Sequence, residues 1–121
     1  EVKLWGTGTP LREFLWSEEM ADASVFVMEH VDFTDTYNQG DKDIRNCHIN
    51  IGTGKEISIR ELAELIVSTV GYQGQLTFDS TKPDGTMRKL TDPSKLHAQA
   101  RPHKEEIEVG VQRMYNWYLG R

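Results

Sequence analysis

The sequence lacks most features of secreted, membrane-spanning or nucleic-acid-binding proteins. Its single cysteine cannot form an internal disulfide, and no apolar run approaches the roughly 20 residues that span a membrane. The net charge of −5 excludes a general basic surface for a nucleic-acid backbone. The four histidines lack the paired spacing of metal ligands, so no metal site is predicted. A reducing cytoplasm fits these features best.

The composition is that of an ordinary folded domain. The chain has 121 residues, of which 37% are hydrophobic and 27% charged, so it is long enough for one core. We therefore expect a single domain over residues 1–121. The sequence begins at Glu1 with no signal-like segment behind it, and this indicates a piece of a longer protein.

The pattern of apolar residues predicts an α/β fold of short strands with three to four helices. Strands are expected at residues 2–5, 12–15, 48–51 and 76–78, and helices at 17–30, 58–70, 92–98 and 104–119. Residues 32–46 and 79–89 are predicted to be loops.

The helix at 58–70 has the clearest signals. Ser58 and Glu61 match a capping box, Gly71 matches a left-handed cap, and an apolar stripe that includes Ile66 and Val70 is expected to be buried. The first helix is expected to be capped by Ser17.

The stretch from Leu4 to Leu15 is the leading candidate for a binding site. An extended segment ends at Trp5, two glycines and a proline form a loop, and the chain becomes extended again at Arg12. Tryptophan offers a flat face for a base or a sugar, and arginine offers a fork of donors that fits phosphate oxygens. A nucleotide needs both groups.

A second stretch, Lys82-Pro83-Asp84-Gly85-Thr86-Met87-Arg88-Lys89, places three cations and one carboxylate close together in an acidic protein. Such a cluster can hold a diphosphate. However, Pro-Asp-Gly is also a common turn sequence, and lysine and arginine are usually exposed. On the residues alone, a diphosphate site and a solvated turn are about equally favoured.

Two further patterns are interpreted as structural. Gly52-Thr53-Gly54-Lys55 stands between a predicted strand and a helix, but Ile57 and Ile49 occupy the positions where a dinucleotide fingerprint and a P-loop need glycine. Cys47 and His48 are neighbours on a predicted strand, so their side chains point to opposite faces and cannot share a proton. Cys47 is expected to be a small buried residue.

The two candidate stretches together resemble a known family. Trp-Gly-x-Gly-x-Pro-x-Arg-Glu-Phe-Leu from Trp5, and Lys-Pro-Asp-Gly-Thr-x-Arg-Lys from Lys82, are similar to two signatures in the carboxy-terminal, sugar-nucleotide-binding region of the GDP-L-fucose synthases. These are NADP-dependent epimerase-reductases of the extended short-chain dehydrogenase type. The resemblance implies that residues contacting the GDP part of the substrate are Trp5, Arg12 and Lys89, with Lys82, Asp84 and Arg88 as weaker substrate-binding candidates.

The resemblance covers only the last third of that family. The glycine-rich NADP fingerprint and the Tyr-x-x-x-Lys pair belong to the amino-terminal part, so no catalytic and no cofactor-binding residue is expected in these 121 residues. By the same resemblance, NADP is the cofactor of the parent enzyme and a GDP-sugar is its substrate. Its amino-terminal Rossmann domain is the partner of this region, and a homo-oligomer is expected.

The sequence departs from the family in two places. The family's His-Val-Asp-Asp is Trp16-Ser17-Glu18-Glu19 here, and its Leu-Gly-Trp corresponds to Ala98-Gln99-Ala100-Arg101, which lacks an aromatic residue. Two alternatives stay open: the same region of another nucleotide-sugar epimerase or dehydratase, and a non-enzymatic binding or assembly domain. The run from Lys82 to Lys89 favours the GDP-L-fucose synthases over the first alternative.

Overall fold

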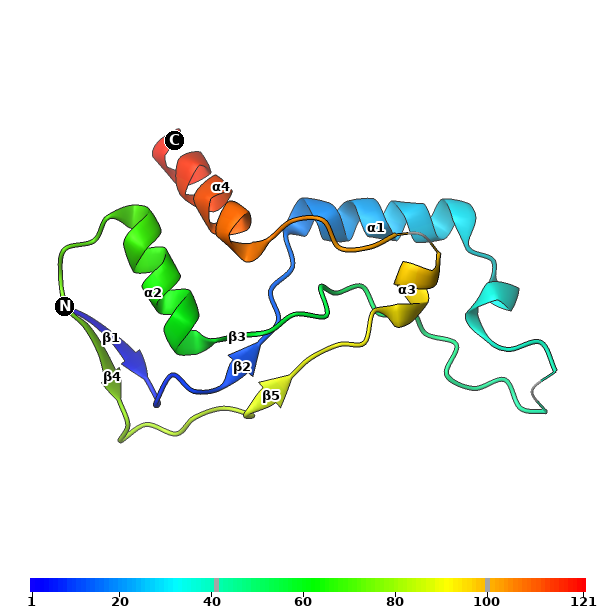
Figure 1. Cartoon of the computed structure of the whole chain (residues 1–121), viewed down its shortest axis with the longest axis horizontal. Helices are drawn as coiled ribbons and strands as arrows, with labels where there is room; N and C mark the ends of the chain where they lie inside the picture. Colours follow the sequence, from blue (N-terminus) through cyan, green and yellow to red (C-terminus); the bar gives the residue numbers. More distant parts are fainter. Residues whose placement is uncertain (41, 100) are drawn as a thin grey trace. The chain divides into compact units, whose positions relative to one another are not determined.

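The computed structural model describes residues 1–40, 42–99 and 101–121; Asp41 and Ala100, with the departure predicted at Ala100, lie outside the described residues (Figure 1). The elements are β1 (Val2–Trp5), β2 (Leu11–Arg12), α1 (Ser17–His30), the 3₁₀ helix η1 (Phe33–Thr36), β3 (Ile57–Ser58), α2 (Ile59–Val70), β4 (Leu76–Asp79), β5 (Arg88–Lys89), α3 (Ser94–Ala98) and α4 (Ile107–Leu119). The predicted α/β fold of short strands and helices is confirmed.

The chain divides into two compact units, which are described separately. Unit 1 comprises residues 1–14, 55–90 and 106–121, and unit 2 comprises residues 15–54 and 91–105. That residues 1–121 form one substrate-binding region stays a prediction.

Unit 1 contains two small sheets. The first pairs β1 with β4 in parallel, from Val2 beside Leu76 to Trp5 beside Asp79. Parallel strands need a crossover connection, and α2 lies directly before β4 in the chain. In the second sheet, β2 lies in the middle, antiparallel to β3 and parallel to β5 (Figure 1).

Helix α2 begins and ends as its sequence predicts. The Ser58 hydroxyl accepts from the Glu61 amide at 3.1 Å, and the Glu61 carboxylate accepts from the Ser58 amide at 2.9 Å, which completes the capping box. Gly71 ends the helix with a φ of +71°, the left-handed conformation that glycine adopts without a steric cost.

The apolar face of unit 1 is incompletely covered. Ile66 is 43% exposed and Val70 is 41% exposed, so the predicted burial of these two positions is wrong. Together with other side chains they line an apolar cavity of about 330 Å³; the lining residues are Val2, Leu4, Ala63, Ile66, Val67, Val70, Tyr72 and Leu76. The stripe on α2 is apolar as predicted, but its outer part has no cover within the described residues.

Two short strands of unit 1 differ from the prediction. The predicted strand at 12–15 is the two-residue β2 (Leu11–Arg12); in its antiparallel register, pairing beyond Arg12 would need partners before Ile57, where β3 begins. The predicted loop at 79–89 contains β5, which pairs with β2 at its end. Strands of two residues are too short for an alternating pattern to reveal them.

Unit 2 holds α1, η1 and α3. Helix α1 spans the predicted residues, but Trp16 is its N-cap and forms no side-chain cap bond, so the prediction that Ser17 caps the helix is wrong. The predicted loop at 32–46 includes η1, which Asp32 and Asp35 hold with a reciprocal capping box. Cys47 is partly exposed rather than buried.

Residues 48–51 are not a strand, contrary to the prediction. The segment is held by side chains instead of a ladder: Asn50 Nδ2 donates to the Asp92 carbonyl at 3.0 Å, and Lys95 Nζ donates to the His48 carbonyl at 3.2 Å. These bonds satisfy polar groups that a neighbouring strand would otherwise pair.

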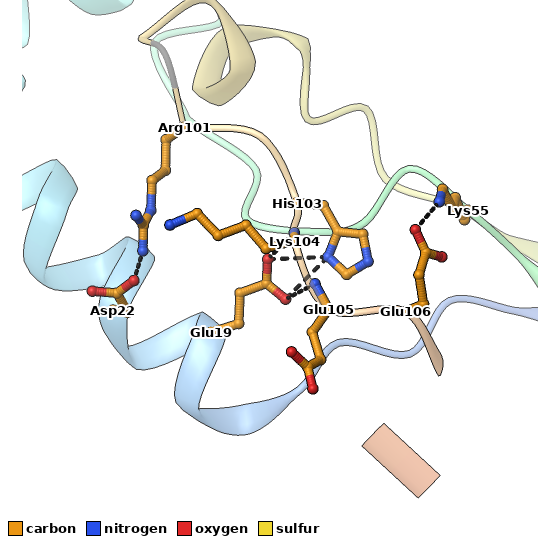
Figure 2. Close-up of polar contacts among 8 residues, drawn as sticks. All are labelled: Glu19, Asp22, Lys55, Arg101, His103, Lys104, Glu105 and Glu106. Carbon is orange, nitrogen blue, oxygen red and sulfur yellow. Dashed lines mark hydrogen bonds and ion pairs between the residues drawn. The ribbon is translucent and has the colours of Figure 1, made fainter. Parts of the chain in front are cut away.

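The last helix begins at Ile107 rather than at residue 104; its N-cap is Glu106, with extended backbone at φ −72° and ψ 151°. Glu19 accepts from the amides of Lys104 at 2.6 Å and Glu105 at 3.3 Å, and an oxygen of Glu19 lies 3.0 Å from His103 Nδ1 (Figure 2). These bonds hold the segment before the helix against Glu19.

Candidate functional site

The two predicted binding stretches meet in unit 1, at the carboxyl ends of β1 and β4. The last register pair of that parallel sheet is Trp5 beside Asp79, so the chain leaves both strands at the same edge. Loops that follow the carboxyl ends of parallel strands are a common place for ligand sites.

A hydrogen-bonded clamp joins the two loops across 77 residues of sequence. The amide of Thr7 donates to Asp84 Oδ1 at 2.8 Å, and the hydroxyl of Thr7 donates to Asp84 Oδ2 at 2.7 Å. Gly6 has a φ of +84°, and a Cβ there would lie 2.3 Å from Asp84 Oδ1. The clamp therefore requires glycine at position 6, because any side chain would displace the carboxylate.

The strands β2 and β5 bring two of the predicted binding cations together. Arg12 lies beside Lys89 in a parallel register, and the Leu11 amide donates to the Met87 carbonyl at 2.8 Å. Side chains in register in a pleated pair stand on the same face, so two positive charges are neighbours here. Neither forms an ion pair within the described part of the chain. Like charges held side by side favour a bound anion.

The guanidinium of Arg12 lies against the second stretch as well. Its Nη1 donates to the Leu11 carbonyl at 2.6 Å, and a Cβ at Gly85 would lie 3.1 Å from its Nη2. A side chain at position 85 would therefore require this guanidinium to shift by a few tenths of an ångström.

Trp5 presents an aromatic surface in the same unit as β2 and β5, the strands that carry Arg12 and Lys89. Its side chain is 75% exposed, and Lys82 Nζ lies 5.6 Å from the ring centroid, within the range of a cation–π contact. An exposed tryptophan gives up much of the stabilisation that burial of its ring would bring, and this is typical of a binding surface.

Two weaker candidates already have partners. Arg88 forms a bidentate pair with Glu56, Nε to Oε2 and Nη2 to Oε1 both at 2.8 Å, and Asp84 is the acceptor of the clamp. Arg88 pairs with Leu11, one residue before the Arg12 pair, so it faces the side of the sheet opposite to Lys89. A substrate contact for either residue stays a prediction.

Sequence analysis missed Arg60 and Phe78, which hold the loop after β1 from the other side. Arg60 Nη2 donates to the Thr7 carbonyl at 2.8 Å, and the guanidinium stands 3.8 Å from the centroid of the Phe78 ring. A Cβ at Gly8, whose φ is +79°, would lie 2.5 Å from Phe78 Cε1. The only signal in the sequence was the pair of glycines, which marks a close approach without naming the neighbour.

The carboxylate of Asp79 is fixed where β4 ends. The hydroxyl and the amide of Thr81 donate to its Oδ1 at 2.5 and 3.1 Å, and these hydrogen bonds hold the pKa of Asp79 below its usual value. Among the described residues, no group of three or more His, Cys, Asp or Glu could hold a metal ion. None of the helices in the described ranges is long and apolar enough to cross a membrane.

Comparison with known proteins supports the resemblance. Residues 1–52 match the model of the NAD dependent epimerase/dehydratase family. GDP-L-fucose synthase 1 of Arabidopsis thaliana is 45% identical over 119 residues, which are 98% of this chain and 33% of that protein. GDP-L-fucose synthase of Escherichia coli (strain K12) is 44% identical over 98% of this chain and 36% of that protein. The chain spans about one third of the length of the curated relatives it matches.

Solved structures give the same relationship. A GDP-6-OMe-4-keto-L-xylo-heptose reductase from Campylobacter jejuni is 42% identical, with a TM-score of 0.91 over 98% of this chain and 34% of that chain. A GDP-mannoheptose C4 reductase from Campylobacter jejuni with NADP bound is 40% identical, with a TM-score of 0.84 over 98% of this chain and 34% of that chain. The chain is therefore a homologue of the GDP-L-fucose synthases, and its fold is that of the C-terminal part of the extended short-chain dehydrogenases.

Proposed function

We propose that this chain is the sugar-nucleotide-binding part of an NADP-dependent GDP-L-fucose synthase, which converts GDP-4-keto-6-deoxymannose to GDP-L-fucose by epimerisation and reduction. The observation that carries the proposal is the register of Arg12 beside Lys89, next to the loop that starts at the exposed Trp5. The homology over 98% of the chain supports the same assignment.

In this proposal the chain binds and orients the nucleotide. The ring of Trp5 stacks on the base, and Arg12 and Lys89 bind the diphosphate with charge-assisted hydrogen bonds. Lys82, which already lies near the Trp5 ring, adds positive charge on the same edge of the site. The bound anion would relieve the repulsion between Arg12 and Lys89.

NADP is assigned to the rest of the parent enzyme, where it supplies the hydride. The glycine turn at residues 52–54 does not fit a dinucleotide. A Cβ at Gly54 would lie 3.2 Å from Cγ of Pro93, and Thr53 is only 7% exposed, so the turn is filled by the protein itself. No catalytic step is assigned to residues of this chain.

A second candidate is a GDP-heptose reductase. The Campylobacter jejuni reductases are about as similar to this chain as the GDP-L-fucose synthases are. Because all of these names share the GDP-sugar, the nucleotide is better supported than the sugar. Another nucleotide-sugar epimerase or dehydratase would prefer a nucleotide with a base other than guanine. A non-enzymatic binding domain would belong to a protein that does not use NADPH.

We also propose that the parent enzyme is cytoplasmic and a homo-oligomer, and that its Rossmann domain packs against this region. The uncovered apolar residues around the 330 Å³ cavity of unit 1 support a packing partner of some kind. Sedimentation equilibrium of the full-length protein over a wide concentration range tests the oligomer, and a monomer at every concentration would contradict it.

The test of the nucleotide assignment is calorimetric titration of the full-length protein with GDP and with UDP. We expect saturable binding of GDP, weaker binding of UDP, and loss of GDP affinity in Arg12→Ala and Lys89→Ala. Glu64→Ala is the matched control, because Glu64 is an exposed charged residue on α2. Absence of GDP binding, or equal affinity in all variants, would reject the proposed site.

A further inference from the structure

We propose that Asp84 is a positioning residue: its carboxylate holds Thr7 so that the loop after β1 and the strand β5 present Trp5, Arg12 and Lys89 to one nucleotide. The inference rests on the proposed function, and it replaces direct substrate contact as the role of Asp84. It draws on the two clamp bonds and on the crowding at Gly6.

The available protons fix the direction of the hydrogen bonds in the clamp. The Thr7 hydroxyl has one proton, which it donates to Asp84 Oδ2, so the 2.7 Å contact with the Thr9 hydroxyl must be a bond that Thr9 donates. The Thr9 amide also donates to the same Thr7 oxygen, at 3.2 Å. Asp84 therefore anchors a small network within the loop, and each of its oxygens has a donor from Thr7.

Charge argues against Asp84 as a phosphate ligand. A carboxylate is an acceptor only and carries a negative charge, so it repels a diphosphate and cannot donate a hydrogen bond to it. The presence of a carboxylate between Lys82 and the pair Arg88 and Lys89 therefore needs another explanation. The clamp provides one, because the two loops come from strands far apart in the chain and a charge-assisted bond fixes their relative position.

The loop is held on its opposite side by α2. Arg60 donates from its backbone amide to the Gly8 carbonyl at 2.9 Å and from its guanidinium to the Thr7 carbonyl at 2.8 Å. Thr7 thus bonds to Asp84 through its amide and hydroxyl and to Arg60 through its carbonyl. Loss of Asp84 would leave the loop fixed to α2 but free to move relative to β5.

Three roles for Asp84 predict three different results for GDP binding to the full-length protein. If Asp84 only adds negative charge, Asp84→Ala tightens binding, because a repulsion is removed. If it contacts the ligand directly, Asp84→Ala weakens binding equally with and without Thr7→Val. If it positions the loop, Asp84→Ala and Thr7→Val each weaken binding, and the double variant is little weaker than Asp84→Ala alone.

We expect the third result, with a loss of affinity of about tenfold for Asp84→Ala, the usual effect of one charged hydrogen bond. Asp84→Asn should restore most of the affinity, because its amide can still accept from the Thr7 amide and bond the hydroxyl. Glu64→Ala is the control for removal of an exposed carboxylate from the same unit. Tighter binding by Asp84→Ala, or additive losses in the cycle, would overturn the inference.

Hydrogen exchange separates this inference from the proposed function. Without ligand, Asp84→Ala should speed exchange of the Thr7 amide, since that amide loses its acceptor, whereas Glu64→Ala should not. If the unmodified protein binds no GDP, the proposed function fails and the exchange rate alone decides the role of Asp84 as the anchor of Thr7. An unchanged Thr7 exchange rate in Asp84→Ala overturns it in either case.

Discussion

Gly8→Ala is the substitution for which unit 1 gives the sharpest expectation, because a matched control stands in the same unit. Gly8 and Gly71 both have left-handed backbone, with φ of +79° and +71°. A Cβ at Gly8 would lie 2.5 Å from Phe78 Cε1, whereas a Cβ at Gly71 would have no atom within 4 Å. The two substitutions therefore share a backbone cost and differ in crowding.

The magnitude follows from that difference. Alanine in the left-handed region costs about 1–2 kcal/mol, and a smaller unfolded-state entropy returns about 0.4–1 kcal/mol; both terms are common to the two variants. Crowding of a packed ring adds about 1–3 kcal/mol at Gly8 alone. The Phe78 ring cannot swing away freely, because the Arg60 guanidinium lies 3.8 Å from its centroid. We expect Gly8→Ala to be less stable than Gly71→Ala by the crowding term.

This difference is measured by urea unfolding, monitored by near-UV circular dichroism and by tryptophan fluorescence. The comparison is valid when the two signals give the same transition and the variants have the same dependence of the free energy of unfolding on urea concentration. Combining Gly8→Ala with Phe78→Leu should recover part of the loss, because the shorter side chain makes room. Equal free energies of unfolding for Gly8→Ala and Gly71→Ala would refute the reasoning, since the ring would then have yielded without cost.

Three further predictions concern the helix cap and the cofactor. Ser58→Ala should destabilise the protein by about 1 kcal/mol in the same assay, with GDP affinity unchanged, because it removes the cap of α2; a neutral result would contradict the cap. Hydrogen bonds from the Ser58 hydroxyl and amide hold the pKa of Glu61 below its usual value. That stabilisation is present above the unfolded-state pKa and is lost as the pH falls through the lower folded-state pKa. The acid limb of the stability curve should therefore be shallower in Ser58→Ala, and identical limbs would argue against the linkage. The 121-residue chain alone should not oxidise NADPH when mixed with a GDP-sugar, and a rate above the blank at 340 nm would overturn the assignment of that chemistry to the rest of the parent.

Local signals predicted the helices better than the strands. The start of α2 followed from Ser58 and Glu61, because a capping box is a property of four consecutive residues. The start of α4 was misplaced, and the segment before it is held by Glu19, which lies 85 positions or more from Lys104 and Glu105 along the chain. No local pattern records a partner at that distance.

The residues of the candidate site were predictable, whereas the register and the hydrogen bonds that join them were not. The two stretches from Trp5 and Lys82 were chosen for their residue types, and the structure brings them together through Thr7 and Asp84. The register of Arg12 beside Lys89 was beyond sequence analysis, because β2 and β5 are two residues long. Cys47 and the stripe on α2 show the converse error: apolar character predicted burial, which also depends on what lies outside the face.

The meeting of the two stretches could nevertheless have been inferred from the order of elements. A strand at 2–5 and a strand at 76–78, with a well-capped helix directly before the second, match a parallel pair joined by a helical crossover. In such a pair the carboxyl ends of both strands lie at one edge, so the loop after Trp5 and the loop after Asp79 must begin together. Residues 15–54, which belong to unit 2, lie within that connection in the sequence. The binding stretches are thus set by the parallel pairing of β1 with β4, and the clamp between Thr7 and Asp84 fixes their final approach.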